Sequence, residues 1–274
     1  MQNKRKMMLK KLIIVLLAIL ISYLAVVYYF YSHQKELLYH PQARTQDEIS
    51  SFAKDKKLLI MKYKSYDGEN LQALYKAPEE GMPIIMLFNG NAAKIERAYS
   101  TLEQFIAKGY GGFINIYRGY GANPGVPDDE SFFRDAEIIY AALKKLNPKS
   151  EIIFYGYSLG SGTATYMASK FENKALILEG AFSSIADVAK DRYPLLPVNL
   201  LLEDKYLNSE YIKSVKSDIL LMHGEDDSIV KPKFAQKLAD ANPRAKLVTY
   251  EAGDHRNLKC LDAYKDAIKW LDQI

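Results

Sequence analysis

The stretch Glu151-Ile-Ile-Phe-Tyr-Gly-Tyr-Ser-Leu-Gly160 is followed by Ser161-Gly-Thr-Ala-Thr-Tyr-Met-Ala168, and this order indicates how the chain folds. The apolar run before Gly156 is prone to form a strand, and the small residues after Gly160 have helical spacing. Between them lies G-x-S-x-G, a motif in which a serine sits on a tight strand-to-helix turn with its Oγ exposed. We therefore predict that Ser158 is a nucleophile. The alternative is an ordinary turn, because glycine and serine are common in turns.

The helix expected after this motif also bears on the chemistry. The first N–H groups of a helix have no intrahelical partner, and the helix dipole favours negative charge at that end. The N–H of Leu159 lies at this helix start, so we expect it to face a developing negative charge. Gly156 and Gly160 are expected to leave room where the strand and the helix approach each other.

The first 31 residues differ in composition from the rest of the chain. Residues 1–11 carry five basic side chains and no acid, and residues 12–31 carry no charge. A run of about 20 mainly apolar residues is long enough to cross a bilayer as a helix. This run ends in Tyr28-Tyr-Phe-Tyr31, and such rings are typical of the membrane interface. We predict a transmembrane anchor at 12–31 and not a cleaved signal peptide, because the run is long and no Ala-x-Ala follows it.

The charge distribution predicts orientation and restricts the partners. The basic flank 1–11 is expected in the cytoplasm, which would put the rest of the chain outside, at a bacterial inner membrane facing the periplasm or the cell exterior. The net charge is +4, and the flank accounts for it, so the remainder is near neutral and no nucleic-acid partner is expected. Cys260 is the only cysteine, which excludes an internal disulfide. The sequence suggests no metal site and no other cofactor.

The remainder of the chain alternates between strand-like and helix-like segments. After a polar connector at 32–57, this alternation runs over about 210 residues and predicts one α/β domain at 58–274. Its sheet is expected to be doubly wound and mostly parallel, with helices on both faces. The expected strands are 58–77 (two strands around Asp67-Gly68), 83–88, 111–117, 152–155, 176–179, 219–222 and 246–250, and the expected helices are 95–107, 128–146, 161–168, 233–241 and 261–272.

One segment breaks this alternation. The part at about 183–216 contains Arg192-Tyr-Pro-Leu-Leu-Pro-Val-Asn-Leu-Leu-Leu202, with two prolines among many apolar residues. Long loops without secondary structure are uncommon in compact domains. We therefore expect a small cap over the site, and the alternative is additional core packing.

An activated serine needs a base within hydrogen-bond reach and a third group that orients the base. Ligands of such sheets bind at the carboxyl ends of the strands, and His255 follows the last expected strand. Two of the other three histidines lie in the connector, and His223 ends a strand, where we expect a structural role. The acid should follow the strand between serine and histidine. Glu225, Asp226 and Asp227 all lie there, and spacing alone does not choose among them.

Motifs along the whole chain after the anchor resemble the α/β-hydrolase superfamily. Within it, the chain is similar to the membrane-anchored serine-hydrolase branch that includes protein depalmitoylases. The order serine, acid, histidine is that of the superfamily. The matching motifs occur in family order: Leu38-Tyr-His-Pro41, Gly90-Asn-Ala92, Tyr117-Arg-Gly-Tyr-Gly121 with Gly125, Gly156-Tyr-Ser-Leu-Gly160, His223-Gly-x-x-Asp227-x-x-Val230 and Gly253-x-His255.

The resemblance implies an α/β-hydrolase fold and acyl transfer. The family pattern H-G-x-x-D-x-x-V selects Asp227 as the acid. His255 would then take the proton of Ser158, Ser158 would attack an ester or thioester carbonyl, and Asp227 would hold the imidazole in its reactive tautomer. Water would release the acyl group in a second step.

The oxyanion hole is also implied by the resemblance. The N–H of Leu159 would supply one donor, and the loop after the strand at 83–88 would supply the second. Asn91 is the first choice in this loop, and Ala92 is the other candidate. The related branch usually has His-Gly-Asn where this chain has Asn-Gly-Asn, so the side chain of Asn89 is expected to brace the loop.

The sequence says less about the substrate. The apolar cap and the anchor point to lipids or lipidated molecules as acyl ester or thioester substrates. Arg118 could bind a substrate carboxylate, although the family uses this arginine to hold the loop that follows its strand. The other function classes are a catalytically inactive hydrolase-like binding or scaffold domain and a serine peptidase that uses the same triad. The oligomeric state is not readable from the sequence.

Overall fold

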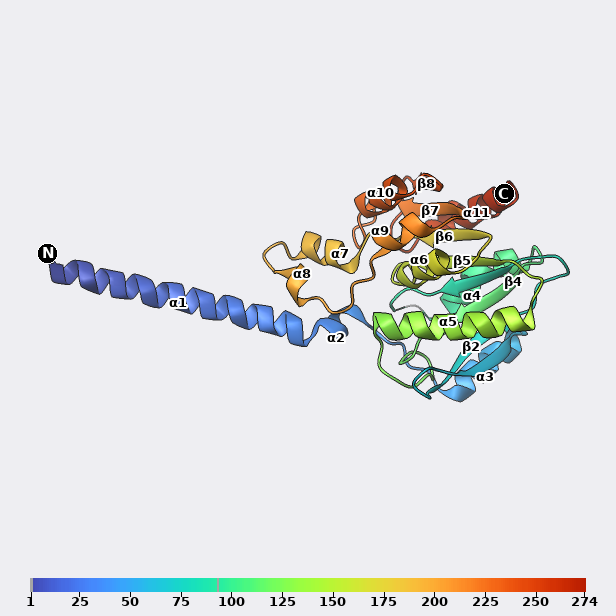
Figure 1. Cartoon of the computed structure of the whole chain (residues 1–274), viewed down its shortest axis with the longest axis horizontal. Helices are drawn as coiled ribbons and strands as arrows, with labels where there is room; N and C mark the ends of the chain where they lie inside the picture. Colours follow the sequence, from blue (N-terminus) through green and yellow to red (C-terminus); the bar gives the residue numbers. More distant parts are fainter. Residues whose placement is uncertain (1, 93) are drawn as a thin grey trace.

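The computed structural model describes residues 2–92 and 94–274. A long helix, α1 (Gln2–Ser32), extends away from an α/β domain (Figure 1). The domain contains one eight-stranded sheet in the order β1-β2-β4-β3-β5-β6-β7-β8, in which β1 and β2 are antiparallel and the strands from β4 to β8 are parallel. The strands are β1 (Leu59–Lys64), β2 (Asn70–Lys76), β3 (Ile84–Phe88), β4 (Gly111–Asn115), β5 (Ile152–Tyr157), β6 (Ala175–Glu179), β7 (Asp218–Gly224) and β8 (Ala245–Tyr250).

Helices cover both faces of the sheet, which confirms the predicted doubly wound fold. The helices α4 (Ile95–Ile106) and α11 (Ala263–Leu271) contact each other on one face. The helices α5 (Asp129–Leu146), α6 (Gly160–Lys170) and α10 (Pro232–Ala241) pack on the other face. Every residue of β3, β4, β5 and β6 is buried, because both faces of these central strands are covered.

The helix α1 has the properties expected of a membrane anchor. It is long and apolar enough to cross a membrane, and none of its residues is buried by the rest of the protein. A soluble helix of this composition would bury an apolar face against a core.

The segment 32–57 is more closely bound to the domain than a polar connector would be. It forms α2 (Gln34–Leu38) and α3 (Gln46–Asp55), and α3 begins with a capping box made by Thr45 and Glu48. The side chain of Ile49 is fully buried, and its neighbour on the same helical face, Ala53, is also buried as α3 contacts β1. The expected boundary at residue 58 is therefore too late, because an apolar pair spaced by one helical turn is easily missed in a polar segment.

The segment expected to be a cap divides into two parts. The helices α7 (Ile185–Arg192) and α8 (Val198–Leu201) lie beside α2 and the adjoining end of α1, away from the sheet (Figure 1). The following part, with α9 (Asn208–Tyr211) and the short 3₁₀ helix at Ile212–Ser214, packs on α6 and α10. The first half of this segment therefore lies where a cap was expected, and the second half forms the additional core packing that was the alternative.

The turn between β5 and α6 depends on close packing at two glycines. A Cβ at Gly160 would overlap with the carbonyl group of Phe88 and would lie 2.6 Å from the carbonyl oxygen of Asn89. A Cβ at Gly156 would lie 2.6 Å from the Cα of Ser161. Each position faces backbone atoms, which cannot move aside as a flexible side chain can, so no larger residue fits there.

We expect Gly160→Ala to destabilise the protein by about 3 kcal/mol, because the new methyl group collides with the end of β3. Gly81→Ala is the control. Its φ of +80° makes a side chain unfavourable, but no atom lies within 4 Å of the added Cβ, and a cost of about 1 kcal/mol is expected. Urea unfolding of the full chain in detergent can be followed by the fluorescence of the single, buried Trp270. Equal losses in the two variants would contradict the packing argument.

Candidate active site

Ser158 occupies a strained turn at the carboxyl end of β5. Its φ is +50°, a left-handed conformation that residues other than glycine rarely adopt. The backbone N–H of Ser158 donates to the carbonyl oxygen of Glu179 at 2.9 Å, which fixes the turn to the end of β6. The side chain remains partly exposed, so its hydroxyl can reach a ligand.

His255 lies in the loop after β8, and the structure brings it to Ser158. Its Nε2 is 2.8 Å from Ser158 Oγ, and its Nδ1 is 2.6 Å from Asp227 Oδ2. An ionised carboxylate only accepts hydrogen bonds, so Nδ1 is the donor to Asp227. In the neutral imidazole this leaves Nε2 as the acceptor for the hydroxyl of Ser158, which is the arrangement that general-base catalysis requires.

Asp227 is the only one of the three candidate acids that contacts His255. Its Oδ1 accepts hydrogen bonds from the backbone N–H groups of Ile229 at 2.9 Å and Val230 at 2.8 Å. Burial acts to raise the pKa of Asp227, but contacts from His223 and His255 outweigh burial and hold this pKa well below its ordinary value. The carboxyl group is therefore ionised over the physiological range.

The other two candidate acids face solvent, whereas His223 contacts Asp227. Glu225 and Asp226 are exposed. The fully buried His223 places Nε2 3.3 Å from Asp227 Oδ2, and the same nitrogen donates to the carbonyl oxygen of Val230 at 2.7 Å. The histidine thus holds both the acid and the loop that carries it, in agreement with the structural role expected for it.

The two expected oxyanion donors lie at the same cavity as Ser158. Leu159 and Asn91 both line it, and within residues 2–92 and 94–274 neither backbone N–H makes a hydrogen bond. The Asn91 side chain holds the loop: it donates to the carbonyl oxygen of Leu38, and it accepts from the His40 N–H and the Tyr120 hydroxyl, each at 2.8 Å. The backbone N–H of Asn91 is the group that we expect to face a ligand. Ala92 also lines the cavity.

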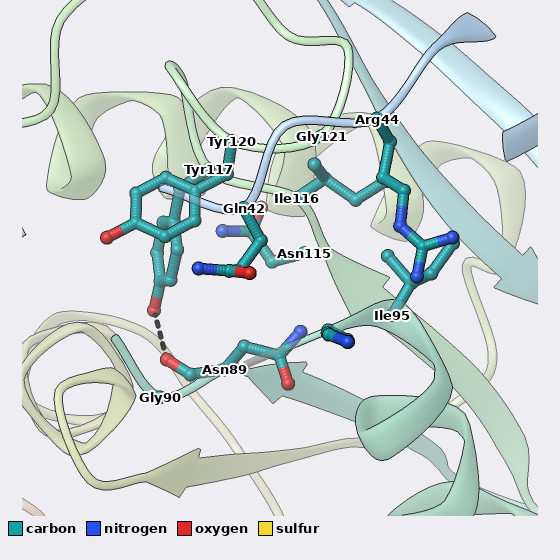
Figure 2. Close-up of a pocket in the computed structure, with 11 residues that line it drawn as sticks. Gln42, Arg44, Asn89, Gly90, Ile95, Asn115, Ile116, Tyr117, Tyr120 and Gly121 are labelled. Carbon is teal, nitrogen blue, oxygen red and sulfur yellow. Dashed lines mark hydrogen bonds between the residues drawn. The ribbon is translucent and has the colours of Figure 1, made fainter. Parts of the chain in front are cut away.

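Asn89 begins the loop that carries these donors. Its carbonyl oxygen accepts a hydrogen bond from the Tyr117 hydroxyl at 3.3 Å (Figure 2). Its buried side chain lines a small cavity of about 20 Å³ together with Asn115, enough space for one water molecule. The buried Asn115 Oδ1 has no hydrogen-bond partner within the described residues, so this cavity is polar. The loop is thus held through its backbone at Asn89 and through its side chain at Asn91.

Arg118 is not placed to bind a substrate. Its Nε donates to Asp135 at 2.8 Å, and its Nη1 donates to Asp67 at 2.7 Å. The guanidinium is buried and does not line the cavity at Ser158. These contacts join the loop after β4 to α5 and to the β1–β2 turn. Arg118 therefore has the structural role that was one of its two expected roles, and it is not placed for the other, binding a substrate carboxylate.

The cavity above Ser158 has a volume of about 770 Å³, which suits a small molecule. Its apolar wall comes from the segment around α2, from α7 and from the loops after β6 and β7. Its charged residues are mostly basic. The apolar lining includes Leu37, Leu38, Phe182, Ile185, Val188 and Val230, and the charged lining includes Lys94, Glu96, Arg97, Arg192 and Arg256.

A separate group of acids has the spacing of a metal site. The carboxylates of Asp128, Asp129 and Asp204 lie within 4.8 Å of one another, at the start of α5. The ammonium group of Lys35 is 3.4 Å from Asp204 Oδ2, and the Asp129 carboxylate accepts the N–H of Lys205 at 2.9 Å. These groups do not line the cavity at Ser158, and contacts within the chain already neutralise part of their charge.

Glu179 is a further residue that sequence reasoning did not single out. It ends β6 and is almost completely buried. Its carboxylate accepts hydrogen bonds from the hydroxyls of Tyr155 at 2.7 Å and Tyr264 at 3.3 Å, and Arg97 lies 3.8 Å away. Burial raises the pKa of Glu179, and these partners act in the opposite direction. In the sequence, the feature that could have pointed to Glu179 is an acidic residue at the end of an otherwise apolar strand.

This raised pKa gives a stability profile with a definite sign. The folded protein keeps the proton of Glu179 at a pH where the unfolded chain has lost it, so the contribution of Glu179 to stability falls as pH rises above about 4.3. We expect the stability of the wild type relative to Glu179→Gln to decrease from pH 4.5 towards neutral pH in urea titrations. The exposed Glu80→Gln variant controls for the loss of one negative charge. A difference that stays constant with pH would refute this expectation.

Comparisons with known proteins agree with this architecture. The family described as alpha/beta hydrolase fold matches residues 83–208. The uncharacterized protein Rv2307c of Mycobacterium tuberculosis is 31% identical over 85% of this chain and 84% of its own length. The zebrafish lysophosphatidylserine lipase ABHD12 is 25% identical over 62% of this chain and 50% of its own length.

Solved structures show the same fold. The esterase Pf2001 of Pyrococcus furiosus superposes with a TM-score of 0.64 at 16% identity, covering 85% of this chain and 97% of the esterase. The order of the strands and the placement of the helices are therefore shared by proteins with little sequence in common. The chain belongs to the alpha/beta-hydrolase superfamily.

Proposed function

We propose that this protein is a serine hydrolase that cleaves acyl ester or thioester bonds. The observation that carries the proposal is the hydrogen-bond relay from Ser158 Oγ to His255 Nε2 at 2.8 Å and from His255 Nδ1 to Asp227 Oδ2 at 2.6 Å. The zebrafish relative, a lipase, and the protein of the Pyrococcus structure, an esterase, support the same class.

In the first half-reaction, Ser158 Oγ attacks the carbonyl carbon of the substrate while His255 Nε2 takes the hydroxyl proton. The ionised Asp227 stabilises the imidazolium that forms. The tetrahedral intermediate then collapses, and the alcohol or thiol leaves with the proton that His255 returns to it. The product of this half-reaction is an acyl ester on Ser158.

The charge on the intermediate falls on the former carbonyl oxygen. The N–H groups of Leu159 and Asn91 are free to donate to this oxygen, and one such donor typically contributes about 10²–10³ in rate. In the second half-reaction, His255 takes a proton from water, the hydroxide attacks the acyl group, and Ser158 leaves with the proton from His255. The acid is released and the enzyme is restored.

The cavity indicates which esters fit. Its apolar wall suits an acyl chain, and its mostly basic rim suits a negatively charged head group. An anionic monoacyl lipid satisfies both conditions, in line with the name of the zebrafish lipase. The basic flank of α1 favours a cytoplasmic N-terminus and therefore a catalytic domain on the other side of the membrane.

The catalytic assignment is tested by a fluorophosphonate probe and by ester hydrolysis. The probe is expected to label the wild type and the exposed-site control Ser228→Ala, but not Ser158→Ala, because the base at Ser158 is itself oriented by Asp227. Asp227→Asn is expected to lower kcat by about 10⁴-fold through the wrong imidazole tautomer. Its matched control, Asp226→Asn, changes a neighbouring exposed acid and should retain activity. Labelling of Ser158→Ala at the wild-type level would end the proposal.

The substrate class is tested at the basic rim of the cavity. Arg192→Gln is expected to raise KM for lysophosphatidylserine about tenfold, because a charge-assisted contact with the head group is lost. The kcat should change little, and KM for an uncharged monoacylglycerol should be unaffected. Lys205→Gln removes an exposed positive charge of the same segment that does not line the cavity. A rise in KM of equal size for both lipids would argue against an anionic head group.

A further inference from the structure

The tip of the cap exposes an unusual amount of apolar surface. We define the cap tip as residues 193–202, which connect the end of α7 to the end of α8. Leu195 is 84% exposed and Leu200 is 87% exposed, the highest values for large apolar side chains in the described chain. The tip also contains two prolines and only one strongly polar side chain, Asn199. Apolar groups of this size in contact with water are unfavourable unless a partner covers them.

The cap tip lies directly against the membrane helix. The hydroxyl of Tyr23 donates to the carbonyl oxygen of Leu195 at 2.9 Å, and the rings of Phe30 and Tyr193 are 4.8 Å apart. Tyr23 precedes the aromatic run at 28–31 by five residues, or about 8 Å along the axis of α1. The cap tip therefore extends past this run to the apolar part of α1, and α7 and α8 are drawn beside that end of α1 (Figure 1).

Part of the backbone of the cap tip is hydrogen-bonded within the protein. The N–H groups of Leu196, Val198, Leu200 and Leu202 donate within the tip, and its two prolines have no N–H. The carbonyl oxygen of Leu195 accepts the hydroxyl of Tyr23. These groups need no water, as contact with lipid requires. The groups of the tip that have no partner within the described residues, such as the Leu195 N–H, would bind water or lipid head groups at the interface.

From these observations we propose that the cap tip is a second membrane contact, inserted into the lipid interface beside α1. Interfacial segments bury their apolar face about 5–10 Å into the head-group boundary, and the contact with Tyr23 places Leu195 within that depth. Lys190 and Arg192 lie at the end of α7, next to the tip, where they can bind lipid phosphates. The occupant of this surface is thus the bilayer that holds α1.

The same arrangement gives the active site an entrance from the membrane; this step rests on the proposed function. A cavity of about 410 Å³ lies between the cap tip and the α1–α2 junction, with Phe30, Tyr193 and Leu196 in its wall. It shares six lining residues with the cavity at Ser158, so the two cavities are adjacent: Leu37, Leu38, His40, Ile185, Val188 and Arg192. We infer that an acyl chain enters from the bilayer and passes between these mostly apolar side chains to Ser158.

Membrane insertion is tested with single nitroxide labels on the full chain in nanodiscs of phosphatidylcholine and phosphatidylglycerol. In a Cys260→Ser background, Leu195→Cys and Leu200→Cys carry the label, Ile19→Cys in α1 is the lipid-exposed reference, and the exposed Leu146→Cys at the far end of α5 is the water-exposed reference. We expect both tip labels to be accessible to oxygen and protected from a water-soluble nickel chelate, as at position 19. Nickel accessibility equal to that at position 146 would overturn the proposal. All four positions are exposed, so labelling should leave the fold intact.

The entrance is tested separately with the double variant Leu195→Glu and Leu200→Glu, two residues that line neither cavity. Hydrolysis of water-soluble p-nitrophenyl acetate should remain at the wild-type rate. Hydrolysis of lysophosphatidylserine presented in the same nanodiscs should fall about tenfold, because the tip no longer enters the lipid. Equal rates, or equal losses, on the two substrates would contradict the entrance. A wild type that cleaves neither ester would refute the proposed function and leave the nitroxide result to decide on membrane insertion.

Discussion

The close approach of α6 to the end of β3 is the constraint on which the site depends. Gly160 lies against the backbone of Phe88 and Asn89, and this packing restricts the conformation of the preceding turn. Ser158 is therefore held at a φ of +50° with its hydroxyl raised. Asn89 is also the first residue of the loop that carries Asn91, so one contact sets both the nucleophile and the loop opposite it. A shift of α6 would displace the two together.

The segment next to the membrane takes part in this arrangement. The side chain of Asn91 binds the backbone of Leu38 and His40, so the loop that carries the Asn91 N–H is joined to the segment that follows α1. The buried Tyr39 lies between those two residues and donates to or accepts from Tyr206, at 3.0 Å. This segment is thus a structural part of the site as well as the connection to α1. A domain that began at residue 58 would lack these contacts.

The sequence pattern predicted those elements of the fold whose residues are neighbours in the chain. The strand, tight turn and helix around Ser158 were readable because the glycines and the apolar run are adjacent in sequence. Spacing could not choose Asp227 over its neighbours, because that choice depends on which carboxylate the loop turns towards His255. The burial of Ile49 and of Glu179 depends on residues far away in sequence: α3, which carries Ile49, contacts β1, and Glu179 contacts Tyr264. Such contacts leave little trace in composition.

The cap is attached on two sides. Ion pairs join Asp187 and Asp191 of α7 to lysines at α10, and further polar contacts join the cap to α2. Gln34 of α2 donates to the carbonyl oxygen of Leu201 at 3.3 Å and accepts the N–H of Glu203 at 2.9 Å, and Lys35 pairs with Asp204. These bonds hold the cap against α2, and the cavity of about 410 Å³ between them is lined mainly by apolar side chains. In the arrangement proposed above, this cavity opens towards the bilayer beside α1, while Ser158, Asp227 and His255 are held in the turn and the loops that follow β5, β7 and β8.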